Sequence, residues 1–181
     1  MDAFLSQKYN LRANWKFLLV SQIFRSAWMI DPQEAIASAD TVFALANRDW
    51  SGFDQTQDLN NAHNREKIPV VGVIASSNSS KKFSDGPLDD FPENSSALIP
   101  IKGTMLKYGT MCSYGTEEVA AAILQAAHHK KIESIILDID SGGGAVDAIA
   151  PLQQSIQKSQ SMGKPVIAHC DTSASAAYWI A

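Results

Sequence analysis

The chain has 181 residues, of which 45% are hydrophobic and 19% are charged, and its formal net charge at pH 7 is -4. This composition predicts a globular protein with one domain, or with one domain and a helical appendage. A negative net charge disfavours binding to a phosphate backbone, so we expect no nucleic-acid partner.

No segment reaches the ~18 apolar residues that a membrane helix requires, and the first residues do not resemble a signal peptide. We therefore expect a cytoplasmic protein without a membrane-spanning segment. The two cysteines, Cys112 and Cys170, lack the spacing of a metal site, and the sequence holds no cofactor motif. Free thiols, no metal and no cofactor are the resulting expectations.

Two helices are predicted at the start of the chain. Residues 13–28 carry apolar side chains at mostly helical spacing. A second helix is predicted from Asp31, which fits an N-cap, and Pro32, which fits the first helical position. Glu34 can then return its carboxylate to the cap amide, and apolar residues continue the pattern to Asn47.

The polar segment 48–67 shows no clear period, so we interpret residues 1–66 as a helical arm, either an appendage or an oligomerisation element. Residues 67–181 are the predicted core. Within the core, the β-branched residues of 68–76 predict a strand. The Ser-, Asp-, Gly- and Pro-rich residues that follow predict a flexible loop over about 76–96.

From residue 97 onward, predicted strands and helices alternate. Alternation with short links indicates right-handed crossovers and a mostly parallel sheet, so the predicted fold class is α/β. Thr116 is the expected cap of the first of these helices. The predicted strands cover 97–103, 133–140 and 164–170, and the predicted helices cover 116–131, 147–160 and a segment that begins at 171.

Two segments are expected beyond the carboxyl ends of neighbouring strands, where ligands bind in such sheets. The first is the glycine-rich turn "DSGGGA", residues 140–145, and the second is "DTSAS", residues 171–175. Taken alone, the first is typical of a connector and the second of a helix cap. Taken together, they favour an acyl-transfer site in which a serine attacks and one amide from each segment holds the oxyanion.

"IILDIDSGGGAVDAI" followed by "GKPVIAHCDTSASAAYWIA" resembles the signal peptide peptidase A family of serine peptidases. That family includes phage head-maturation proteases of the protein C type, and its members share the fold of the Clp protease proteolytic subunit and of crotonase. The resemblance covers roughly residues 69–181. It implies a Clp protease/crotonase-like core and a polypeptide substrate, which is scaffold or capsid protein in the prohead for phage-type members. It also implies assembly into a homo-oligomer.

The resemblance assigns roles to individual residues. Ser175 aligns with the nucleophile, and the amides of Gly143 and Ala176 align with the oxyanion hole. Ser173 aligns with a cap or spacer. Gly142 stands where the family has a proline, and alanines follow Ser175 where the family has glycines.

In this family the general base is a lysine whose pKa is lowered by burial. It lies downstream of the serine or in another repeat, and no lysine of this sequence matches it. We therefore expect a truncated piece of a Ser-Lys endopeptidase that is inactive alone. Two alternatives stay open: a non-catalytic oligomeric scaffold of the same fold, and an acyl-CoA enzyme in which the paired amides hold an enolate.

Overall fold

The computed structural model describes residues 15–47, 71–76, 79–83, 88, 91–110 and 113–181. Its main layer is a five-stranded mixed sheet with the order β3-β2-β4-β5-β7. Strands β4, β5 and β7 run parallel, whereas β2 is antiparallel to both β4 and β3. The strands are β2 (Val71–Ser76), β3 (Ser79–Phe83), β4 (Ser95–Lys102), β5 (Ile132–Ser141) and β7 (Val166–Ser173).

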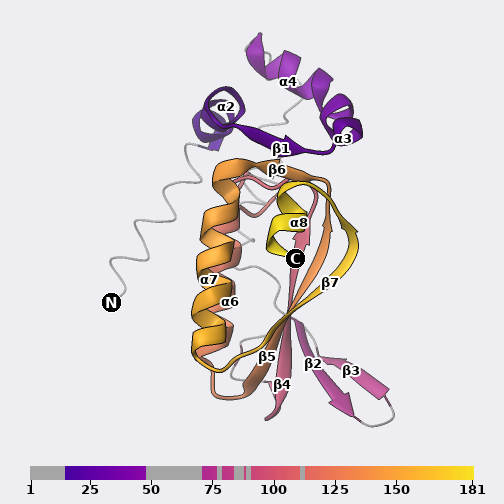
Figure 1. Ribbon diagram of the computed structural model, residues 1–181, viewed down its shortest axis with the longest axis vertical. Coiled ribbons are helices and arrows are strands. Elements are labelled where there is room, and N and C mark those ends of the chain that lie inside the picture. Colours follow the sequence, from indigo (N-terminus) through magenta and orange to yellow (C-terminus); the bar gives the residue numbers. More distant parts are fainter. Residues whose placement is uncertain (1–14, 48–70, 77–78, 84–87, 89–90, 111–112) are drawn as a thin grey trace, which may run out of the picture.

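Two helices, α6 (Thr116–His128) and α7 (Ile149–Ser161), pack against each other and against one face of the sheet (Figure 1). The core lies between these layers. Alternate residues of β5 are fully buried there, and Ile123 and Leu152 meet them from the two helices. This burial explains the β-branched character of the strand, because such residues pack well on a pleated surface.

The predicted alternation of strands and helices from residue 97 onward is confirmed, including a three-stranded parallel sheet. The helix expected over 147–160 begins at Ile149, after a 3-10 turn, η3 (Val146–Ala148), so that Pro151 lies in its first turn. Proline is tolerated there because the first amides of a helix have no intrahelical acceptor.

Two local predictions are wrong. The cap of α6 is Gly115, one residue before Thr116, and the Glu118 carboxylate accepts a hydrogen bond from the Gly115 amide at 2.9 Å. The predicted flexible loop over 76–96 contains β3, which pairs with β2 along its length. Pairing with a neighbour overrides the polar, turn-like composition of that segment. Of the strand expected over 68–76, residues 68–70 lie outside the described residues.

The N-terminal part consists of α2 (Trp15–Arg25), β1 (Trp28–Ile30), α3 (Pro32–Ala37) and α4 (Ala39–Ala46), which we call the N-terminal arm. The arm lies across the end of the sheet where β5 and β7 finish (Figure 1). The helix expected over 13–28 ends earlier, at Arg25, and Trp28 begins the strand β1; residues 13–14 lie outside the described residues. The helix expected over 31–47 is divided in two at Ser38.

The predicted cap of α3 is confirmed, because Asp31 Oδ2 accepts hydrogen bonds from the amides of Gln33 at 3.0 Å and Glu34 at 3.4 Å. The prediction that Glu34 returns to the cap amide is wrong. Its carboxylate accepts from Thr104 Oγ1 at 2.8 Å, and the Asp31 amide donates to the Gly142 carbonyl at 2.7 Å. The start of α3 is thus joined to the core.

The glycine-rich turn also differs from expectation. Residues Gly143–Ala145 form a short strand, β6, which pairs antiparallel with β1 in a separate two-stranded sheet. The last helix, α8 (Ala176–Ile180), follows β7 after a sharp turn. Among the described residues, no helix is both long and apolar enough to cross a bilayer.

Candidate functional site

Ser175 has an unusual backbone conformation in the turn between β7 and α8. Its φ is 55° and its ψ is -118°, a combination of backbone angles that residues other than glycine rarely adopt. Strain of this kind persists only where the surrounding structure imposes it, and it is concentrated at functional sites. The Ser175 hydroxyl makes no capping hydrogen bond to α8. Ser175 therefore occupies the N-cap position of α8 without making the side-chain hydrogen bond of a helix cap.

Gly143 lies directly against Ser175. Its φ is 103°, which favours glycine, and a Cβ on Gly143 would overlap the Met29 carbonyl oxygen. The same atom would lie 2.9 Å from Ser175 Cβ and 3.0 Å from the Ala176 nitrogen. The structure therefore brings together the three residues to which the resemblance assigns the nucleophile and the oxyanion hole.

The two amides assigned to the oxyanion hole differ in their present partners. The Gly143 amide donates to Ser141 Oγ at 3.2 Å, and that hydroxyl donates to the Gly103 carbonyl at 2.6 Å. The Ala176 amide donates to no acceptor in the described part of the chain. A substrate oxyanion is a stronger acceptor than a neutral hydroxyl, so it can compete for the Gly143 amide.

Ser173, to which the resemblance gives the role of cap or spacer, lies at the end of β7 opposite Ser141. It does not cap α8, whose N-cap is Ser175. The Ser173 hydroxyl oxygen is buried and has no hydrogen-bond partner among the described residues. Of the two roles that the resemblance offers, the cap is not realised at Ser173, which is the last residue of β7.

No lysine is seen in contact with Ser175 in the described part of the chain. Lys102 pairs with Asp138, Lys107 lies 3.9 Å from Glu117, and Lys164 donates to the Ile132 carbonyl. Two further lysines, Lys130 and Lys131, lie between α6 and β5, at the amino end of the parallel strands. Ser175 lies past the carboxyl end of the sheet, and a strand as long as β5 spans roughly 30 Å.

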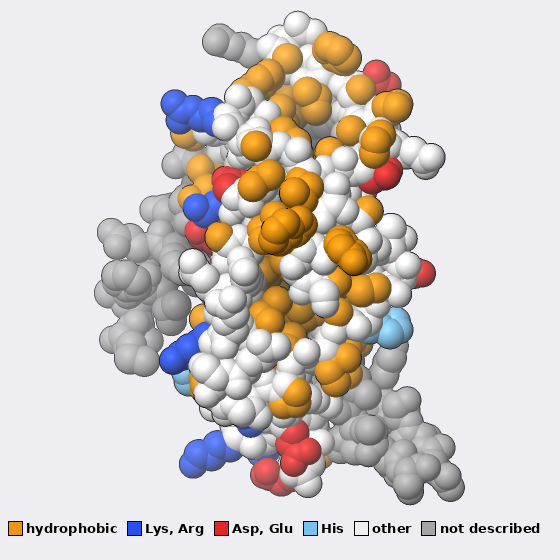
Figure 2. Space-filling view, in the orientation of Figure 1, with side chains coloured by type: hydrophobic (Ala, Val, Ile, Leu, Met, Phe, Trp, Pro, Cys, Tyr) orange, Lys and Arg blue, Asp and Glu red, His pale blue; other side chains and the backbone are white. Residues whose placement is uncertain are grey.

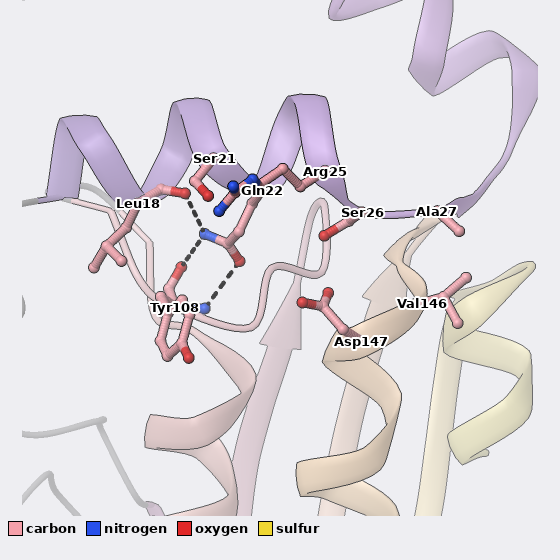
Figure 3. Close-up of a pocket in the computed structure, with 9 residues that line it drawn as sticks. All are labelled: Leu18, Ser21, Gln22, Arg25, Ser26, Ala27, Tyr108, Val146 and Asp147. Carbon is pink, nitrogen blue, oxygen red and sulfur yellow. Dashed lines mark hydrogen bonds between the residues drawn. The ribbon is translucent and has the colours of Figure 1, made fainter.

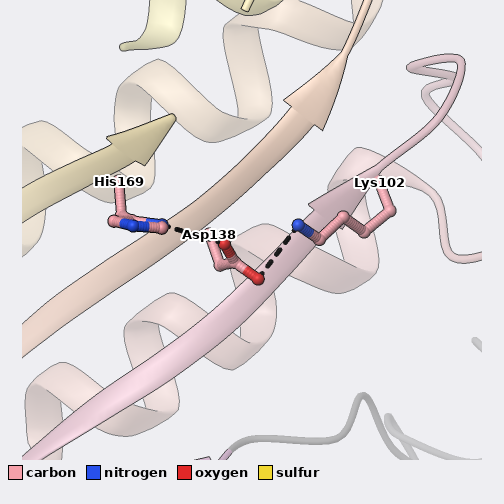
Figure 4. A network of polar contacts seen from close by, with 3 residues as sticks. All are labelled: Lys102, Asp138 and His169. Atoms are coloured by element: carbon pink, nitrogen blue, oxygen red, sulfur yellow. Dashed lines mark hydrogen bonds and ion pairs between the residues drawn. The ribbon is translucent and has the colours of Figure 1, made fainter. Parts of the chain in front are cut away.

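Three polar side chains form a cluster across the parallel strands, which the sequence analysis did not identify (Figure 4). Asp138 Oδ2 lies 3.0 Å from Lys102 Nζ, and Asp138 Oδ1 lies 3.1 Å from His169 Nδ1. Burial by itself raises the pKa of Asp138, but hydrogen bonds and charge from Lys102 and His169 outweigh it, so the pKa is lowered from 3.8. The available signal was that each of the three strands carries a charged or imidazole side chain between apolar residues.

This cluster, which we call the Lys102–Asp138–His169 cluster, is separate from Ser175. His169 precedes Ser175 by six residues along β7 and the turn, which corresponds to about 20 Å in an extended chain. Its imidazole is 70% exposed on the sheet surface. The structure therefore contains a carboxylate-imidazole pair, but does not bring it to the serine.

A pocket of about 430 Å³ lies between α2 and the core (Figure 3). Gln22, on the wall of this pocket, is buried, and its side-chain amide accepts from the Tyr108 amide at 3.1 Å and donates to the Tyr108 carbonyl at 3.5 Å. Both ends of this side chain are therefore used to hold α2 on the core. The described residues contain no group of three or more His, Cys, Asp or Glu side chains that could hold a metal ion.

Comparison with known proteins adds no assignment, because no protein-family model and no curated protein matches the chain. What the chain does must therefore be argued from the geometry around Ser175 and from the sequence motifs that meet there.

Proposed function

We propose that this protein is a serine endopeptidase of the signal peptide peptidase A type, built on a Clp protease/crotonase-like fold, with Ser175 as its nucleophile. The observation that carries the proposal is the strained backbone of Ser175 in direct contact with Gly143. Nucleophilic serines typically lie in a sharp strand-to-helix turn of this kind. The Ser175 hydroxyl makes no capping hydrogen bond to the helix, so it is available to attack. Its position beyond the carboxyl ends of parallel strands also supports the proposal.

The chemistry assigns one task to each group. Ser175 Oγ attacks the carbonyl carbon of a peptide bond, and the amides of Ala176 and Gly143 donate to the oxygen that becomes negative. The serine proton passes to a neutral lysine and then to the departing amine as the carbon–nitrogen bond breaks. Water hydrolyses the resulting ester, which restores the hydroxyl and releases the acid product.

The general-base lysine that the mechanism requires is not identified among the described residues, so it has to come from elsewhere. The described lysines for which a partner is identified are engaged away from Ser175. A base from another subunit of a homo-oligomer satisfies the mechanism, and a phage-type role in cutting scaffold or capsid protein would place that oligomer in the prohead. A Ser-Lys site works at neutral pH only if the amine is desolvated, because burial lowers the pKa of lysine.

An active-site-directed fluorophosphonate tests the nucleophile directly. The chain is incubated with an alkyl fluorophosphonate between pH 7 and pH 10, with methylamine added as a substitute for the missing lysine base, and the adduct is located by peptide mass spectrometry. We expect modification at Ser175, with a rate that rises with pH as the hydroxyl becomes easier to deprotonate. Ser175→Ala removes the adduct, whereas Ser173→Ala, which deletes the hydroxyl two residues earlier, retains it.

An adduct that is absent, or that is spread over several serines, would count against the proposal and favour a non-catalytic scaffold. A separate expectation concerns turnover. The purified 181-residue monomer should hydrolyse no unfolded polypeptide at a measurable rate, because no described lysine reaches Ser175. Robust cleavage by the monomer that disappears in Ser175→Ala would show that the base lies within this chain.

A further inference from the structure

We propose that β1 is an intramolecular strap that occupies the place of an extended polypeptide on β6, beside Ser175, and that a polypeptide binds only when the strap leaves. This inference rests on the proposed function for its chemistry. Its geometry rests on the pairing of β1 with β6 and on the contacts of the strap with the core.

Both edges of β6 are occupied. On one edge, β1 pairs antiparallel with β6, with Met29 opposite Gly144 and Ile30 opposite Gly143. On the other edge, the Met105 amide donates to the Gly143 carbonyl at 2.8 Å, and the Ala145 amide donates to the Met105 carbonyl at 2.9 Å. A polypeptide that adds to β6 as a strand must therefore displace one of these two neighbours.

The two neighbours differ in how firmly they are held. Met105 is 3% exposed and belongs to the hydrophobic core, so its removal would open the domain. Trp28, at the start of the strap, is 37% exposed, and Met29 packs against the core only as a partly buried side chain. The strap is therefore the neighbour that a polypeptide can displace.

The strap also reaches the predicted catalytic atoms. The space where a Gly143 Cβ would sit is bounded by the Met29 carbonyl oxygen, Ser175 Cβ and the Ala176 nitrogen. The backbone carbonyl of the strap thus borders the same space as the nucleophile residue and an amide assigned to the oxyanion hole. A substrate carbonyl has to occupy this same region, so strap and substrate exclude each other.

Contacts on both sides of the strap hold it in place. Before it, the Gln22 side chain forms two hydrogen bonds with the backbone of Tyr108 (Figure 3). After it, Glu34 accepts from Thr104 Oγ1. A Cβ on Gly142 would meet the end of the Glu34 side chain, and a Cβ on Gly143 would meet the Met29 carbonyl oxygen. The glycine-rich segment therefore lies in close contact with the arm.

Strand addition of this kind relies on backbone hydrogen bonds, so the occupant is an extended polypeptide without a folded structure of its own. The strap competes with it as part of the same chain, at an effective concentration of the order of millimolar. A free peptide therefore binds weakly while the strap is seated. The arm would act as an autoinhibitory device that limits cleavage until a substrate or an assembly contact removes it.

A reversible cross-link tests the strap. Trp28 and Ala145 lie directly opposite each other in the ladder. Opposite residues have Cα atoms about 4.5–5.5 Å apart, within the range that a disulfide spans. The double variant Trp28→Cys/Ala145→Cys is prepared with both native cysteines replaced by serine. It also carries Ser175→Ala, so that binding of a peptide is measured without acylation. The probe is a fluorescein-labelled peptide of residues 26–34, "SAWMIDPQE", followed by fluorescence anisotropy.

The oxidised, locked protein should not bind the peptide, and reduction should restore weak binding. Met29→Pro, which removes an amide from the strap and disfavours the strand, should bind the peptide at least about tenfold more tightly than the parent. Trp28→Cys alone is the matched control and should not respond to oxidation. Equal peptide affinity in the locked, reduced and Met29→Pro proteins would overturn the strap.

Fluorophosphonate labelling of the double-cysteine protein with Ser175 restored separates the two proposals. Labelling that is at least about tenfold faster after reduction supports both the strap and the nucleophile. Labelling that is equally fast in both states supports the nucleophile and overturns the strap. No labelling in either state, with peptide binding still controlled by the lock, overturns the peptidase and leaves the strap as a gate on a binding site.

Discussion

The molecule holds two groups of candidate residues, one on the parallel strands and one beyond their carboxyl ends, and they differ in whether side chains or backbone are constrained. The Lys102–Asp138–His169 cluster has the side chains that catalysis often uses, in ordinary hydrogen bonds on relaxed strands. The group around Ser175 offers one hydroxyl and a few amides. Its backbone, however, has positive φ at both Ser175 and Gly143, and these residues are in contact.

The comparison indicates that side-chain chemistry alone is a poor guide to a functional site. Partly exposed pairs such as Asp138 with Lys102 form readily on any sheet surface and contribute little to stability. A strained serine beside a glycine requires packing from several segments, here from β6, α8 and the strap. Apolar side chains gather on the surface over α8 and the strands near it (Figure 2), where Tyr178 is 74% exposed and Trp179 is 67% exposed.

The sharpest way to break the Ser175 group is Gly143→Ala. The added methyl would meet backbone atoms of the strap and of α8, and alanine disfavours a φ of 103°. We expect a loss of about 3 kcal/mol or more in the free energy of unfolding, measured by urea denaturation. Gly163→Ala is the matched control, because its φ is 79° but nothing lies within 4 Å of the new methyl.

Gly163→Ala should therefore cost only the backbone strain, about 1 kcal/mol. The difference between the two variants measures the close packing at Gly143 separately from its φ. Equal losses of unfolding free energy in the two variants would mean that the contacts of Gly143 with Met29 and Ser175 are loose. The group around Ser175 would then be no more constrained than the Lys102–Asp138–His169 cluster.

A smaller effect with the opposite sign is expected for Ser175→Gly. Glycine adopts positive φ without strain, so the substitution should raise the free energy of unfolding by about 1 kcal/mol, after allowance for its greater freedom in the unfolded chain. Thr172→Gly, three residues earlier in extended β7, is the control and should lower it by about 1 kcal/mol. If thermal denaturation finds Ser175→Gly destabilised to the same degree, Ser175 is not strained.

Much of the fold was predictable because local signals and topology agree. The apolar run of β5, the lysine-proline start of the next strand and the helical spacing of α6 and α7 each predict the element that forms. Once the strands are parallel, the segments after β5 and β7 must meet at one edge, so the contact of Gly143 with Ser175 follows from the chain order.

The strap and β6 were not predictable in the same way. "WMI", residues 28–30, continues the helical spacing before it, and "GGA", residues 143–145, has low strand propensity. Each is a strand only because the other lies beside it, 115 positions apart in the register of Met29 with Gly144. The side-chain amide of Gln22 and the carboxylate of Glu34 find partners 86 and 70 positions away in sequence, at Tyr108 and Thr104. Local patterns carry no information about such contacts.

The smallest expected effect concerns the Lys102–Asp138–His169 cluster. Asp138→Asn keeps the shape but removes the charge, and we expect it to lower the free energy of unfolding by less than about 1 kcal/mol at pH 6. Because Lys102 and His169 lower the pKa of Asp138 in the folded protein, its contribution is present above 3.8, the ordinary value for an aspartate. The contribution is lost as the pH falls through the folded pKa, because protonation then costs the folded state its ion pairs.

Urea denaturation between pH 3 and pH 6 should therefore show that the gap in unfolding free energy between parent and variant closes toward the acid end. A gap that widens on acidification would show that Asp138 is destabilised by its surroundings, and the cluster would then be as strained as the group around Ser175.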